Sequence, residues 1–173
     1  MTFGIMKRAP PTLALLALAM FAVFAVRADA PLSPPSAHQV VSQNSAFIAI
    51  SSPTNGTRVL NKVTKKELWF MSGWFRWLFV SNDGNHAVTG YAGMNLIPVN
   101  YTDDLVLLTF WEKGKKIRKV TLKEIVPSKS ILTRTVSHYH WGTIDGINDK
   151  GSLVVNRSDG KILLFDVTTG IQQ

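Results

Sequence analysis

Short runs of β-branched and aromatic residues alternate along this chain with turns rich in Gly, Asn and Asp. Runs of this kind are typical of strands, and the turns place Gly or Asx where a hairpin needs a positive φ. The clearest turns are Asn82-Asp83-Gly84, Lys113-Gly114, Asp149-Lys150-Gly151 and Asp159-Gly160. No segment has the sustained 3.6-residue periodicity of an amphipathic helix. The sequence therefore predicts an all-β fold built of antiparallel meanders.

Strands are expected at residues 46–50, 57–63, 67–71, 75–81, 87–91, 95–99, 105–111, 117–121, 136–141, 152–156 and 161–166. One short helix is expected at residues 122–126. Thr121 stands at its N-cap, Glu124 completes a capping box three residues later, and Pro127 ends it.

Two segments repeat the same order of features. WLFVSNDGNHAVTGYAG (77–93) and INDKGSLVVNRSDGKILLFDVTTG (147–170) each run from an Asn-Asp-Gly type of turn through an apolar strand to a Gly turn. These segments resemble β-propeller blades of the YVTN/WD40-like kind, in which SNDG and LFDVTTG stand at turns between blade strands. A propeller needs at least four blades of roughly 40 residues. Three to three and a half blades fit here, so an incomplete propeller or a twisted sandwich is expected.

Residues 45–170 also resemble a group of uncharacterised exported bacterial proteins. The likeness rests on GWFRWLFVSNDGNHAVTGYAGMNLIP, LLTFWEKGKKIRKVTLKEIVP and RTVSHYHWG. This resemblance implies an exported, compact all-β domain and brings no activity with it.

Residues 1–30 have the three zones of a secretory signal peptide: basic Lys7-Arg8, an apolar run over 13–26, and Ala28-Asp29-Ala30 for cleavage. The apolar run is shorter than the ~20 residues that span a bilayer, so no stable membrane insertion is expected after cleavage. An uncleaved N-terminal anchor is the alternative. Residues 31–44, rich in Pro and Ser, are predicted to form an extended linker, and residues 45–173 a single β domain.

Cleavage after Ala30 would leave 143 residues and lower the formal net charge from +8 to +6. The chain has no cysteine, so a domain in the periplasm or the medium would be held together by its core alone. Export argues against cytosolic cofactor enzymes. It also argues against a nucleic-acid partner, for which the sequence carries no recognised binding motif.

The segment Ser137-His138-Tyr139-His140-Trp141 is the first candidate site. On a strand, His138 and His140 share one face, and Tyr139 and Trp141 share the other. Two imidazoles at this spacing could supply two metal ligands, with His86 or an Asp as the third. In the alternative, the aromatic residues pack in the core and the histidines bond to loops or face water.

An aromatic run over residues 69–79 is the second candidate. Most of it is expected in the core, but Arg76 could stack on Trp74 or Trp111, and an exposed part with Trp77 would suit a sugar ring or a peptide. The hairpin over 111–120 concentrates Lys and Arg. It is either a contact for anionic partners or a solubilising sheet edge.

No nucleophile elbow, phosphate-cradling loop or His-Glu-x-x-His pair is present in the sequence, so an enzyme is not favoured and no cofactor is expected. The leading hypothesis is an exported, non-enzymatic β domain that binds an envelope protein or an anionic glycan. Its predicted binding residues are Arg76, Trp77, His138, Tyr139, His140 and Trp141. The alternative is a periplasmic metal-binding protein or a small metal-dependent hydrolase that uses His138 and His140.

Overall fold

A computed structural model describes residues 31–173, so the predicted signal peptide 1–30 lies outside the described part of the chain. Within residues 31–173 the chain forms fourteen strands, one α-helix and one 3-10 helix. Every named strand pair is antiparallel. The prediction of an all-β fold of antiparallel meanders with one short helix is confirmed.

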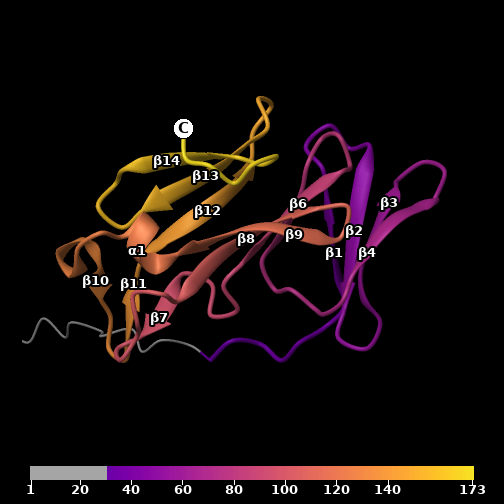
Figure 1. Ribbon diagram of the computed structural model, residues 1–173. Coiled ribbons are helices and arrows are strands. Elements are labelled where there is room, and N and C mark those ends of the chain that lie inside the picture. The colour runs from indigo at the N-terminus through magenta and orange to yellow at the C-terminus, as the bar shows by residue number, and fades with distance from the viewer. Residues whose placement is uncertain (1–30) are drawn as a thin grey trace, which may run out of the picture.

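The strands form four sheets (Figure 1). Sheet A has the order β1 (His38–Val41), β2 (Phe47–Ser52), β3 (Gly56–Asn61) and β4 (Glu67–Met71). Sheet B has the order β5 (Leu78–Val80), β6 (His86–Gly90), β8 (Val106–Glu112) and β9 (Lys115–Thr121). Sheet C has the order β10 (Thr133–Arg134), β11 (His138–His140) and β7 (Leu96–Pro98). Sheet D has the order β12 (Gly142–Ile147), β13 (Ser152–Arg157) and β14 (Ile162–Asp166).

Sheets A, B and D are stacked, with sheet B in the middle. Its A-facing side, which includes Val80 and Trp111, packs in one apolar cluster with Val59 and Trp69 of sheet A. The larger cluster joins Phe110 on the opposite side of sheet B to the inner face of sheet D and to helix α1 (Leu122–Ile125). In Figure 1, sheet A accordingly lies at one end of the molecule and sheet D at the other. The middle sheet thus has both faces buried, whereas each outer sheet has one.

The local signals in the sequence place the turns and the helix correctly. Gly84, Gly114, Gly151 and Gly160 all have a positive φ, between 68° and 85°. Helix α1 begins after Thr121, whose backbone N–H donates to Glu124 at 2.9 Å in the predicted capping box. A short 3-10 helix, η1 (Lys129–Ile131), follows it. No helix in residues 31–173 has both the length and the apolar character needed to cross a membrane.

Strand β1 lies inside the predicted linker 31–44, which is a departure from the sequence expectation. Residues 38–41 pair with β2, from His38 opposite Ser51 to Val41 opposite Ile48. The Pro-rich part, which favours extended chain without pairing, therefore ends before His38. Both valines that follow it gain a partner strand, and Val40 packs beside the core.

Strand β12 is absent from the predicted strands, because two glycines and an Asp made residues 142–147 resemble a turn. The structure pairs this segment with β13 and accommodates Asp145 in a bulge between Ile144 and Gly146. The strand predicted at 136–141 is in turn shortened to β11, and Trp141 joins it to β12.

Candidate functional site

Strand β11 carries the His-Tyr-His segment and lies in the middle of sheet C. His138 is paired with Pro98, Tyr139 with Ile97 and His140 with Leu96. Ile97 is fully buried, and Tyr139 packs partly buried against the main core beside it. The pleat therefore places the two histidines on the face opposite Tyr139, as the spacing predicts.

Tyr139 is surrounded by a second tyrosine and two cations. The ring of Tyr101 meets it edge-on, with 5.9 Å between the ring centroids. The ammonium of Lys129 and the guanidinium of Arg134 lie over the Tyr139 ring, at 5.2 Å and 5.0 Å from its centroid. We refer to these four residues as the tyrosine–cation cluster.

Backbone geometry places both cations of the cluster beside Tyr139. Lys129 begins helix η1, which is capped by Ser128 accepting from the backbone N–H of Ser130. Arg134, on β10, donates to the carbonyl oxygen of His138 at 3.1 Å. Within residues 31–173, neither cation forms an ion pair with a carboxylate. Two positive charges are therefore held side by side and are not neutralised by an acidic neighbour from the described chain.

His138 and His140 have different hydrogen-bond partners. The Nδ1 atom of His138 lies 2.8 Å from the hydroxyl of Ser137, and that of His140 lies 3.0 Å from the hydroxyl of Ser158. Ser158 also donates to the carbonyl of His140 at 2.7 Å, which fixes the β11–β12 corner. Among residues 31–173, no group of three His, Cys, Asp or Glu side chains is placed to hold a metal ion. The third ligand that a metal site on this pair would need is thus missing from the described residues.

Burial lowers the pKa of His140 below its usual 6.5, because desolvation disfavours the charged imidazole. The unfolded chain therefore binds more protons than the folded chain between the lowered pKa and 6.5. The contribution of His140 to stability is complete above pH 6.5 and is lost as the pH falls through this window. We expect the urea midpoint of the wild type to drop from pH 7.5 to pH 5.5 by more than that of His140→Gln. Equal drops in the two proteins would contradict this assignment.

The other predicted binding residues, Trp141, Trp77 and Arg76, do not belong to the tyrosine–cation cluster. Trp141 is fully buried, and Trp77 packs on it edge-on with 6.0 Å between ring centroids. A buried indole cannot contact a ligand, so the expectation that Trp141 belongs to a binding face is corrected. Arg76 stacks on Trp74, at 4.9 Å from the ring, and donates to the carbonyl of Ser33 at 2.6 Å. The predicted stacking on Trp74 is present. The hydrogen bond from Arg76 to Ser33 holds the N-terminal segment against this site.

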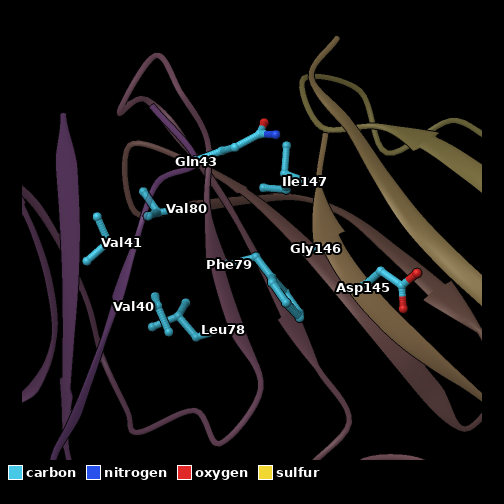
Figure 2. A pocket seen from close by; sticks show the side chains of 9 residues that line it. All are labelled: Val40, Val41, Gln43, Leu78, Phe79, Val80, Asp145, Gly146 and Ile147. Carbon is cyan, nitrogen blue, oxygen red and sulfur yellow. The ribbon is translucent and has the colours of Figure 1, made fainter. Parts of the chain in front are cut away.

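A cavity of about 470 Å³ opens on the histidine face of sheet C. It is lined by Pro31, Leu32, Tyr91, Gly93, Leu96, Pro98 and His138. A second cavity, of about 460 Å³, lies where β1, β5 and β12 converge (Figure 2). We call it the axial cavity. Figure 2 shows Val40 and Leu78 side by side at one end of it and Gln43 beside Ile147 at another.

The predicted basic hairpin is formed by β8 and β9, and β9 is the outermost strand of sheet B. Lys115, Lys116 and Lys119 are exposed on it, and Lys116 lies 5.2 Å from the centroid of Trp111. Lysines at this edge discourage pairing with another strand, which accords with the solubilising alternative.

No family model matches the chain, and no curated protein matches it. Among solved structures, the chain is similar to "Structure of U3-55K" and "Crystal structure of RRP9 WD40 repeats". Each has a TM-score of 0.44 and 10% identity over 83% of this chain and 39% of that chain. It is also similar to "Kuenenia stuttgartiensis Hydrazine Synthase", with a TM-score of 0.39 and 15% identity over 78% of this chain and 34% of that one. The chain thus spans about two fifths of the length of the first two structures. At these identities, no activity or partner of these proteins transfers to it.

Proposed function

We propose that this protein is an exported, non-enzymatic binding module that holds an acidic segment of an envelope protein at the tyrosine–cation cluster. The observation that carries the proposal is the placement of Lys129 and Arg134 against Tyr139, without a carboxylate partner among residues 31–173. Guanidinium and ammonium groups form charge-assisted hydrogen bonds with carboxylates, which are roughly twice as strong as neutral ones.

An acidic peptide suits this cluster better than a sugar ring does. Stacking a sugar needs a free aromatic face, and the ring of Tyr139 already contacts two cations and Tyr101. A carboxylate instead needs the donor groups that the cations present. An anionic glycan shares that charge but lacks a ring platform here, so it is the competing outcome of the test.

The proposed export is supported by the sequence of residues 1–30, which has a basic start, an apolar run and an Ala-Asp-Ala cleavage pattern. N-terminal sequencing of the protein recovered from the periplasm should read from Pro31. A cytoplasmic protein with its N-terminus intact would overturn this part.

The binding proposal is tested with Lys129→Ala/Arg134→Ala. Because each charge-assisted hydrogen bond contributes about 1.5–3 kcal/mol, we expect the affinity for a poly-glutamate peptide to fall by at least about tenfold per residue. Fluorescence anisotropy with a labelled peptide measures this.

Lys150→Ala/Lys161→Ala is the matched control, because it removes the same charge from exposed turn positions beside sheet D. An equal loss in the control would assign the affinity to net charge instead of the cluster. Tighter binding of polygalacturonate than of poly-glutamate, lost in the same variant, would make the partner a glycan.

A further inference from the structure

We propose that two copies of this chain close into a six-bladed ring, in which sheet A of each copy docks on sheet D of the other. The first observation is that both outer sheets leave apolar side chains exposed on their outer faces. On sheet A, strand alternation places Val41, Ile50 and Phe70 on the face away from sheet B, and these side chains are 42%, 39% and 46% exposed. Arg58 lies between Ile50 and Phe70 on this face and pairs with Glu67. Apolar side chains gathered on one exposed face are typical of an interaction surface.

Sheet D has the complementary free face. Phe165 points inward and packs on Phe110 of sheet B, at 6.1 Å between ring centroids. Ile162 and Leu164 alternate with the inward residues and therefore lie on the outer side, next to Val154. Ile162 is 61% exposed. The chain thus carries one free apolar face at each end of its three-sheet stack.

The sheets are arranged like blades around an axis. Strands β1, β5 and β12 are the edge strands of sheets A, B and D, and β5 contacts both of the others. The axial cavity lies where these three strands converge (Figure 2). If another sheet packed on the free face of sheet A or D as these sheets pack on sheet B, its edge strand would lie beside β1 or β12 around the same axis.

The number of blades in closed propellers selects two copies of this chain. Closed propellers typically have 4–8 blades. Each chain supplies three stacked sheets, and six is the only multiple of three in that range. The two docking contacts are then identical and are related by a twofold axis along the centre of the ring. This ring would enclose the axial cavity, which a single chain leaves incomplete.

Charge and area both suit contact between sheets A and D. Residues 38–71 contain four basic residues and one acidic residue, a net charge of +3, and residues 142–173 contain three basic and four acidic residues, a net charge of −1. Opposite charge favours contact between unlike ends over contact between like ends. From strand spacing and rise, the two free faces span together about 650 Å² per chain, near the ~800 Å² per partner of a standard interface.

The test is the mass of the purified protein in solution, measured by light scattering after size exclusion. We expect a dimer for the wild type and a monomer for both Ile50→Asp, on the free face of sheet A, and Ile162→Asp, on that of sheet D. Val63→Asp is the control: Val63 is 84% exposed in the β3–β4 turn, and this variant should stay dimeric.

Mixing the two monomeric variants separates this arrangement from others. In an equimolar mixture, one of the two contacts joins the intact sheet A of one variant to the intact sheet D of the other, and the second contact carries both substitutions. Dimers that are weaker than those of the wild type should therefore reappear. A monomeric wild type, an open polymer, or a dimer that only one of the two substitutions dissociates would overturn the proposal. A monomeric or polymeric wild type overturns the proposal even if a variant fails to fold.

Discussion

Replacing Trp141 with alanine is expected to lower the free energy of unfolding by about 3–5 kcal/mol, the range for a fully buried Trp or Phe. The Trp141 side chain has no exposed surface, and its Nε1–H donates to the carbonyl of Met94 at 2.7 Å. Truncation would therefore leave a cavity in the main core, and it would also remove the donor for that carbonyl. Urea unfolding followed by tryptophan fluorescence measures the change.

Trp74→Ala is the matched control. Trp74 is half-buried, stacks with Arg76, and donates through Nε1 to the carbonyl of Ser36 at 2.7 Å. It thus makes the same kinds of contact as Trp141 at the surface, where their loss costs about 1 kcal/mol. Similar losses in both variants would show that Trp141 does not have the buried position described here.

Gly114→Ala is expected to destabilise the protein by more than about 2 kcal/mol, because two costs combine. Gly114 has a φ of 82° in the β8–β9 hairpin, where an L-residue pays about 1–2 kcal/mol. A Cβ at this position would also overlap the carbonyl oxygen of Phe70 in β4. This atom belongs to the backbone and cannot rotate away, so the hairpin and sheet A would have to separate locally. Thermal unfolding by circular dichroism measures the effect.

Gly160→Ala separates these two costs. Gly160 has a nearly identical φ of 85°, but a Cβ there would meet nothing within 4 Å. Gly160→Ala should therefore lose only the roughly 1–2 kcal/mol that a positive φ costs an L-residue. If the two variants lose equal stability, the close approach of Gly114 to β4 contributes nothing.

The sequence predicts the parts of the fold whose signals are local. The positive φ values of Gly84, Gly114, Gly151 and Gly160 follow from turn chemistry, and helix α1 follows from Thr121 and Glu124. Strands β1 and β12 could not be found in this way. Their residues become strands only because β2 and β13, from elsewhere in the chain, offer partners for their backbone groups.

The candidate site was predicted only in part for the same reason. Tyr139 stands out in the sequence because of its aromatic and histidine neighbours. Lys129 and Arg134 lie in an ordinary polar segment, and only the fold of η1 and β10 brings them over its ring. Trp141 was assigned to a binding face because an indole suits a ligand platform and a core equally well, and periodicity alone does not separate these roles.

The burial of both faces of sheet B has a consequence for the order in which the chain folds. Sheet A is made of residues 38–71 and can form all of its hairpins before sheet B exists. Its inner face, with Val59 and Trp69, gains a cover only when residues 78–121 arrive. A nascent chain thus passes through a stage in which sheet A is complete in backbone pairing and apolar on both sides. The hairpins within each sheet form quickly because their loops are short. The apolar inner face of sheet A, however, stays exposed and prone to aggregation until sheet B has formed.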